Sequence, residues 1–288
     1  MNVLFMGGHE LGAITLENLI LNNINIVGVV VTETDNEWYS GVDLIANKHN
    51  IKLYRESNIN NINFINSVKK LNVDLITSVN FGQILKSDII NLPSKGCINT
   101  HASLLPNYRG RAPLNWAILS GEKEVGVTVH YIEEGIDTGD IIIQERIAVK
   151  DTDYIGDVLN SVKSIYPGIV LEAVKLIENN KVVAVTQDIS KGSYYGKRST
   201  KDGEIDVNKS SNEIMNLIRA VSKPYPGSFV KVDGKRIIIW KAEIIDNNIN
   251  KYNIRYNGQF VERNNEIVIK VRDGLLVAKE YEWCENQK

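Results

Sequence analysis

The sequence predicts an α/β domain built on a mostly parallel sheet, followed by a small β domain. Short apolar runs alternate with helix-like segments over the first half of the chain. A polar, glycine-containing stretch follows Gln187, and the rest of the chain contains one short helix and a series of short strands. We therefore place the first domain at residues 1–189, a linker at 190–203 and the C-terminal domain at 204–288.

Length and composition are those of a globular protein. The chain has 288 residues, is 43% hydrophobic, and carries a net charge of -2, which argues against a broad electrostatic grip on nucleic acid or an acidic membrane. Cys97 and Cys284 are its only cysteines, and neither a CxxC motif nor a histidine cluster is present. We expect no disulfide framework, no metal and a cytoplasmic location. The apolar start, MNVLFMGGHELG, lacks a positive leader and is read as a strand.

The first half of the chain alternates strand and helix. Val3–Met6 is apolar and ends in a glycine turn, and Leu11–Leu19 has helical spacing of its large apolar residues. The next elements continue the alternation and are, in order, a strand at Ile26–Val31, a helix at Val42–Lys48 and a strand at Val73–Asn80. A sheet covered by helices follows from this pattern.

Two β-branched runs come next, at Gly126–Ile132 and Asp140–Val149, separated by the turn-rich EEGIDTG. They predict a hairpin-like pair of strands. Ile155–Glu178 then has a long helical pattern, in which we expect Pro167 to start a new helix or to bend this one.

The C-terminal part begins with a helix at Ser210–Val221, where Glu213 is placed as the capping-box partner of Ser210. Asp-Gly turns at Asp233 and Asp273 then separate short strands. These strands are predicted at Phe229–Val232, Arg236–Trp240, Gln259–Val261, Glu266–Val271 and Leu275–Lys279. The pattern predicts a small, barrel-like β domain.

The stretch CINTH contains the first sign of chemistry, because Asn99 and His101 interrupt what should be an apolar strand. Strand residues alternate sides, so both can face one pocket while Thr100 faces the other way. Ligands bind at the carboxyl ends of parallel strands. An amide donor suits an oxyanion and an imidazole accepts a proton near neutral pH, so the pair suits acyl transfer.

Such a histidine works best with a carboxylate beside it. Asp137, in the glycine-flanked GIDTGD, is the candidate, and Asp140 is the runner-up because it resembles a cap at a strand start. No G-x-S-x-G occurs, which disfavours a covalent acyl-enzyme. The attacking nucleophile should therefore belong to a substrate.

Each of these candidate residues also has a purely structural interpretation. A lone Asn or His at a strand end is more often a hydrogen-bonded structural residue than a catalyst. Cys97 is expected to be a packed small hydrophobe, and His130 a strand residue. In MGGHELG, His9 replaces the second glycine of a dinucleotide fingerprint, so a nicotinamide enzyme is disfavoured. His9 either caps the glycine turn or lines a pocket.

The blocks INTHASLLPNYRGRAP and GVTVHYIEEGIDTGDII resemble the formyltransferases that use 10-formyltetrahydrofolate. This family includes methionyl-tRNA formyltransferase and the sugar-nucleotide N-formyltransferases. The resemblance implies a Rossmann-like catalytic domain followed by a C-terminal OB-like domain. It also implies that Asn99, His101 and Asp137 form the active site, which selects Asp137 over Asp140.

The resemblance extends to FGQIL, which matches the loop that lines the pterin pocket of the family. It implies 10-formyltetrahydrofolate as co-substrate, without a metal. The residues that it assigns to the folate site are Phe81, Gly82, Gln83, Ile84, Leu85 and Asp140.

The acceptor is inferred from three further segments. In the methionyl-tRNA enzymes a basic insertion follows the second strand, but VTETDNEWYSGVDLIANKHN is short here and acidic at its start, so we expect no nucleic-acid partner. YYGKRSTKDGEID and NLIRAVSKPYPG resemble segments of enzymes that act on uridine- and thymidine-diphosphate amino sugars. The resemblance implies a nucleotide-linked amino sugar for cell-surface polysaccharide synthesis, with dTDP favoured over UDP or GDP.

Charged and aromatic residues near these segments are assigned to the acceptor. They are His9, Tyr108, Arg109, Lys197, Arg198, Asn216, Arg219 and Tyr225. Their alternative interpretation is a solvated linker with a few packed aromatics. We also expect a homodimer and no membrane association. Methionyl-tRNA stays the alternative acceptor, and a non-catalytic folate- or nucleotide-binding module is a third hypothesis.

Overall fold

The computed structural model describes residues 1–32, 41–232, 235–245, 252–263 and 266–285. The predicted turn at Asp233 and the acidic stretch at 33–40 lie outside these residues. The chain divides into two compact units, which consist of Met1–Gly110, Gly126–Ile147 and Ser161–Tyr194, and of Arg111–Val125, Ala148–Asn160 and Tyr195–Lys288. Within the described residues, no helix has the length and apolar character needed to cross a membrane.

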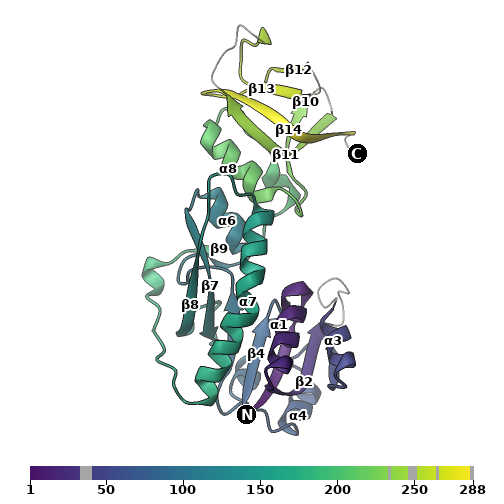
Figure 1. The fold of residues 1–288 in the computed structure, drawn as a ribbon, viewed down its shortest axis with the longest axis vertical. Helices are drawn as coiled ribbons and strands as arrows, with labels where there is room; N and C mark the ends of the chain where they lie inside the picture. The colour runs from purple at the N-terminus through teal and green to yellow at the C-terminus, as the bar shows by residue number, and fades with distance from the viewer. Residues whose placement is uncertain (33–40, 233–234, 246–251, 264–265, 286–288) are drawn as a thin grey trace. The chain divides into compact units, whose positions relative to one another are not determined.

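The first unit contains a seven-stranded sheet in the order β3-β2-β1-β4-β5-β7-β8. Figure 1 labels β2, β4, β7 and β8 of this sheet. Its strands are β1 (Asn2–Gly7), β2 (Asn25–Thr32), β3 (Leu53–Glu56), β4 (Leu75–Val79), β5 (Cys97–His101), β7 (Glu124–Tyr131) and β8 (Ile141–Ala148). The strands from β3 to β5 pair in parallel, and β5 pairs with β7 in the antiparallel sense. The expected mostly parallel sheet is confirmed.

Helices complete this α/β unit. They are α1 (His9–Leu21), α3 (Val42–Lys48), α4 (Ile62–Lys69), α5 (Ser87–Ile90) and α7 (Ile155–Glu178). The sequence analysis missed β3 and α4. The strand β3 is LYRE, too short and polar to show a β pattern. By contrast, all five residues of β4 are buried, and the apolar run that this requires made the strand recognisable from the sequence.

The helix α7 is continuous from Ile155 to Glu178, so the alternative in which Pro167 starts a new helix is wrong. Buried residues lie on both sides of the proline, with Val162 and Val170 fully buried. Their packing outweighs the roughly 3 kcal/mol cost of an interior proline. The partly buried carbonyl of Pro167 accepts a hydrogen bond from Asn18 Nδ2 at 2.8 Å, so this backbone group has a partner.

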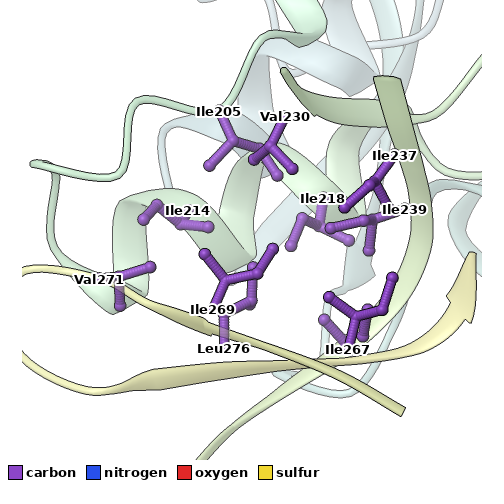
Figure 2. Packing of buried hydrophobic residues seen from close by; sticks show 12 residues of the cluster. Ile205, Ile214, Ile218, Val230, Ile237, Ile239, Ile267, Ile269, Val271 and Leu276 are labelled. Carbon is purple, nitrogen blue, oxygen red and sulfur yellow. The ribbon is translucent and has the colours of Figure 1, made fainter. Parts of the chain in front are cut away.

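The second unit contains a five-stranded antiparallel sheet in the order β10-β11-β14-β13-β12. Its elements are α6 (Pro113–Leu119), α8 (Ser211–Val221), β10 (Ser228–Val232), β11 (Lys235–Ile245), β12 (Phe260–Arg263), β13 (Glu266–Lys270) and β14 (Leu275–Glu285). Figure 2 shows Ile214 and Ile218 of α8 packed against sheet residues such as Ile239. The predicted capping box is present at the start of α8.

The segment expected to be an irregular linker contains short elements. They are η1 (Ile189–Lys191), β9 (Tyr194–Tyr195) and η2 (Thr200–Gly203). The strand β9 pairs with β6 (Arg109–Gly110), which is far away in sequence. A two-residue strand has no periodicity of its own, so only the tertiary pairing makes it visible.

Candidate active site

Three neighbouring parallel strands, β1, β4 and β5, end at one edge of the sheet. The registers pair Gly7 with Val79 and Val79 with Thr100, so the segments after these strands begin side by side. Asn99 is the only residue of β5 that is not buried, whereas Thr100 is 4% exposed. Asn99 is therefore the partly exposed residue of this strand.

The structure brings His101 and Asp137 together. His101 Nδ1 lies 3.6 Å from Asp137 Oδ2, and the two side chains are 7% and 12% exposed. The other ring nitrogen, Nε2, lies 2.8 Å from the carbonyl oxygen of Tyr108. Because a carbonyl only accepts, Nε2 carries the proton. In neutral His101 the lone pair is therefore on Nδ1, on the side of the carboxylate.

A second histidine, His130 of β7, joins this group. It is directly opposite Asn99 in the antiparallel register and is 2% exposed. Its Nε2 lies 3.4 Å from Asn99 Nδ2 and 3.6 Å from Asp137 Oδ1. The sequence analysis placed His130 on a strand but assigned it no function. A polar ring in an otherwise β-branched run was the same signal that identified Asn99 and His101.

The loop that carries Asp137 is held by several bonds. Asp137 has a φ of 55°, which is unusual for a residue with a side chain. Gly110 N–H donates to Asp137 Oδ2 at 2.9 Å. Gln187 Nε2 donates to the carbonyl oxygens of Asp137 and Gly139, at 3.1 and 2.6 Å. These bonds fix a strained backbone and aim the carboxylate at the histidines.

Burial and charge set the protonation of these groups in opposite directions. Burial alone would raise the pKa of Asp137, but the charge that His101 carries when protonated, the neighbouring His130 and the hydrogen bond from the Gly110 N–H together lower it to about 2. Burial lowers the pKa of His101, and Asp137 opposes that shift. At neutral pH we therefore expect an ionised Asp137 beside a neutral His101 that is ready to accept a proton.

The thiol nearest in sequence is not a nucleophile. Burial raises the pKa of Cys97 to about 12, so the reactive thiolate is scarce at neutral pH. The site thus offers an amide donor, an unprotonated imidazole nitrogen and a carboxylate. This set of groups suits acyl transfer to a nucleophile supplied by a substrate.

Comparison with known proteins places the chain in a family. The formyl transferase model matches residues 1–174, and the model of the formyl transferase C-terminal domain matches residues 197–288. The chain belongs to the formyl transferase family. The resemblance noted in the sequence is therefore confirmed.

Relatives of this formyltransferase include enzymes with different acceptors. It is 37% identical over 257 residues to a methionyl-tRNA formyltransferase of Alkaliphilus oremlandii, covering 86% of this chain and 82% of the relative. It is 38% identical over 250 residues to the bifunctional polymyxin resistance protein ArnA of Wigglesworthia glossinidia brevipalpis. That match covers 85% of this chain but only 38% of ArnA, so the chain spans about two fifths of that relative.

Solved structures share the fold over nearly the whole chain. One is WlaRD, a sugar 3N-formyltransferase solved with dTDP and 5-N-formyl-THF, with a TM-score of 0.74, 24% identity, and coverage of 100% of this chain and 99% of WlaRD. Another is an N-formyltransferase from Helicobacter canadensis in complex with folinic acid and dTDP-3-aminofucose. Its TM-score is 0.74, with 23% identity and coverage of 97% and 99%. At these identities the likeness establishes the fold.

The predicted folate loop of this formyltransferase directly follows β4. The side-chain amide of Gln83 is used internally, since Oε1 accepts from Ile59 N–H at 3.0 Å and Nε2 donates to the Glu56 carbonyl at 2.6 Å. Leu85 is 6% exposed and belongs to the core, whereas Gly82 and Ile84 are exposed. The loop is thus anchored by side chains while part of its backbone faces outward.

The other residues predicted in the first unit are His9, Tyr108, Arg109 and Asp140. His9 begins α1 with a φ of 56°. Tyr108 provides the carbonyl that holds His101. Arg109 donates its backbone N–H to the Ser193 carbonyl at 2.9 Å, and its Nε is buried without a hydrogen-bond partner among the described residues. Asp140 directly precedes β8, and its carbonyl accepts from Tyr131 N–H.

In the second unit, an aromatic and cationic cluster surrounds Trp116 of α6. Its ring stacks on Tyr195, with centroids 4.8 Å apart, and the Arg198 guanidinium lies 4.6 Å from the Trp116 ring centroid. Lys197 is exposed. Of these residues, Lys197 and Arg198 were assigned to the acceptor from the sequence, and Trp116 was missed because a lone tryptophan in a short helix has no pattern.

Arg219 makes several hydrogen bonds within the second unit. It is 6% exposed, and its guanidinium donates to the carbonyls of Asp153 and Lys150, at 2.7 and 2.8 Å, and to Asn216 Oδ1 at 3.3 Å. These bonds attach α8 to the segment before α7, and they also occupy Asn216. Tyr225 is 37% exposed. Three of the five N–H groups of Arg219 thus have partners within this unit, and its assignment to the acceptor stays a prediction.

Proposed function

We propose that this protein transfers the formyl group of 10-formyltetrahydrofolate to the amino group of a nucleotide-linked amino sugar. The observation that carries the proposal is that Asp137 lies 3.6 Å from His101 and 3.6 Å from His130, and that His130 in turn lies 3.4 Å from the amide of Asn99. In a chain of the formyl transferase family, such a group has a direct use.

Each side chain has one role in the proposed reaction. Bound 10-formyltetrahydrofolate would supply an activated formyl carbon for attack by a primary amine. Asn99 donates an N–H to the formyl oxygen as negative charge develops on it. The Nδ1 of His101 and the Asp137 carboxylate together hold the proton that the amine loses, and that proton can return to the departing folate nitrogen. Asp137 stabilises the imidazolium while it exists.

The folate donor fits the loop at residues 81–85. The backbone N–H groups of this loop take part in no hydrogen bond within the described part of the chain. They lie in the segment that follows β4, next to the end of β5. Backbone donors at a strand end suit the polar edge of a pterin, and the exposed Ile84 suits its flat face.

Two features support a sugar nucleotide as acceptor. Lys197, Arg198 and the ring of Trp116 offer charge for a diphosphate and an aromatic surface for a base. Two solved sugar N-formyltransferases of the same fold match this chain over almost their entire length. The acidic residues at the start of 33–40 also disfavour a large RNA.

Methionyl-tRNA is the second candidate acceptor. The relatives with curated names include methionyl-tRNA formyltransferases at 37% and 35% identity. Residues 197–288 contain 17 basic and 13 acidic side chains, an excess that suits phosphate neutralisation. This alternative keeps the donor and the catalytic group and changes only the amine.

A direct assay distinguishes the two acceptors. The protein is incubated with 10-formyltetrahydrofolate and either charged initiator methionyl-tRNA or a panel of thymidine-, uridine- and guanosine-diphosphate amino sugars. Release of tetrahydrofolate is followed by absorbance and the formylated product by mass spectrometry. We expect turnover with a dTDP-amino sugar; turnover with methionyl-tRNA alone would transfer the proposal to the second candidate.

A further inference from the structure

The Nε2 atom of His130 has two polar neighbours, Asn99 and Asp137. The protonation of the other ring nitrogen, Nδ1, determines which of them Nε2 can bind. Asn99 Nδ2 lies 3.4 Å from Nε2, and Asp137 Oδ1 lies 3.6 Å from it. The titratable neighbours of the ring are thus Asp137 and, through its charge, His101. Asn99 approaches as a donor, whereas the carboxylate can only accept.

The tautomer of His130 follows from its contact with the backbone. Nδ1 lies 2.7 Å from the carbonyl oxygen of Tyr131. Since that oxygen only accepts, Nδ1 must carry the proton, and a neutral ring then has its lone pair on Nε2. A lone pair at Nε2 accepts from the amide N–H of Asn99 and repels the carboxylate.

We propose that neutral His130 is a positioning residue for the Asn99 amide. By accepting one of the two N–H bonds of Nδ2, it fixes which way round the amide lies. The second N–H bond of the same NH₂ group, and not the carbonyl Oδ1, is then left for the open edge of the sheet. The inference rests on the proposed function, since it assumes that Asn99 stabilises an oxyanion.

The surroundings of His130 hold the ring in this tautomer. A Cβ added at Gly139 would overlap the carbonyl oxygen of Tyr131, the acceptor of the Nδ1 proton. The Gly139 carbonyl is bound in turn by Gln187, which is 8% exposed. The glycine therefore allows the Asp137 loop to approach the carbonyl that fixes the imidazole.

The first test needs no substrate. In protein with ¹⁵N-labelled histidine, the chemical shifts of the imidazole nitrogens distinguish a protonated from an unprotonated nitrogen. At neutral pH we expect His130 to be protonated at Nδ1 and unprotonated at Nε2. A proton on Nε2 would direct the ring to Asp137 and would overturn the proposal.

The second test uses matched variants in the full chain. His130→Gln places an amide oxygen near the position of Nε2 and keeps an acceptor for Asn99, whereas His130→Leu removes it. We expect His130→Leu to lower kcat by up to about 10²-fold with little change in KM, because a misplaced catalytic group loses rate rather than binding. His130→Gln should stay within a few-fold of the wild type. His49→Gln, the same exchange far along the chain, is the control.

A double-variant cycle separates positioning from a general structural effect. In an Asn99→Ala background, His130→Leu should cost no further kcat, since the group that it orients is gone. Independent losses that multiply would overturn the proposal, as would full activity of His130→Leu alone. If the wild type formylates no acceptor, the proposed function fails, while the tautomer measurement still decides the inference on His130.

Discussion

Two buried polar clusters of this protein differ in how many of their donors and acceptors already make hydrogen bonds. Around Arg219, each of the three guanidinium nitrogens donates a hydrogen bond, two of them to backbone carbonyls. Around Asp137, the contacts to the two histidines are 3.6 Å, longer than hydrogen bonds, and the Asn99 amide has a second N–H to give. Both clusters contain charged groups that are almost excluded from water.

The difference shows why burial of a charged residue alone is a poor sign of function. A saturated cluster contributes to stability, because breaking it leaves unpaired groups in the interior. A buried cluster in which donors or acceptors have no partner lowers the stability of the fold. Clusters of this kind occur at catalytic and binding sites. The following experiments test whether the two clusters divide between stability and catalysis in this way.

The largest effect is expected at Asn99. Asn99→Ala removes the amide donor at the open edge, so kcat should fall by ~10²- to 10³-fold while binding of a folate analogue is retained. Steady-state kinetics and calorimetric titration measure the two quantities. The exposed Asn91→Ala serves as control. Near-normal turnover of Asn99→Ala would remove the amide from the mechanism.

Arg219→Ala should act on stability instead. The change leaves two backbone carbonyls and Asn216 without their donor, so the free energy of unfolding should drop by roughly 2–4 kcal/mol. Urea unfolding measures this drop, with Lys201→Ala as an exposed control. If stability were unchanged and KM for the acceptor rose, Arg219 would contact the acceptor. The contrast between a stabilising cluster and a catalytic one would then be wrong.

The ionised Asp137 should make stability depend on pH. Its pKa is lowered from 3.8 to about 2, so its contribution of about 2 kcal/mol is present above 3.8 and is lost as pH falls toward 2. Asp137→Asn keeps an acceptor for Gly110 but does not titrate. The stability advantage of wild type over this variant should therefore shrink from about pH 5 downward. A pH-independent difference would contradict the assignment.

The activity should show a separate acid limb. His101 accepts the proton only when neutral, and burial lowers its pKa from 6.5. The rate kcat/KM should thus hold down to pH values below 6.5 and then fall by about tenfold per pH unit. His101→Gln, measured over the same range, should lack this limb. A limb that lies above 6.5, or that survives in the variant, would exclude His101 as the titrating group.

The smallest effect is expected at Tyr166, a buried residue whose hydroxyl already has a hydrogen-bond partner in β5. Tyr166 is 1% exposed, and its hydroxyl donates to the Thr100 carbonyl at 3.3 Å. Tyr166→Phe should lower stability by about 1 kcal/mol and change kcat by less than a few-fold. Thermal unfolding and kinetics measure both. A large loss of kcat at unchanged stability would place Tyr166 in the reacting group.

Much of the first unit was readable from the sequence because its signals are local. The strands β1, β2 and β4 are apolar runs, and α3 was predicted with the bounds that the structure has. The alternation in CINTH predicted that Asn99 and His101 share a side. The sequence could not show that β7 lies against β5 with His130 opposite Asn99, since register is a property of paired strands.

Arg219 shows what residue type alone does not reveal. Its charge and position near a family-like segment suggested a ligand, and the structure adds that the carbonyls of Lys150 and Asp153, far away in sequence, each accept a hydrogen bond from it. Likewise, β9 exists only because β6 pairs with it. Residue type predicts what a side chain is able to bind, whereas the fold decides whether something already occupies it.

The sequence by itself determined the class of fold, the family and the residue types of the candidate catalytic group, because hydrophobic periodicity and short motifs are local properties of the chain. The tertiary structure decided that His130 lies opposite Asn99, which nitrogen carries each proton, and which polar groups are already paired. These properties depend on distances of a few ångströms between residues that are far apart in number. Hydrogen bonding and desolvation vary steeply over such distances, so no local pattern encodes them.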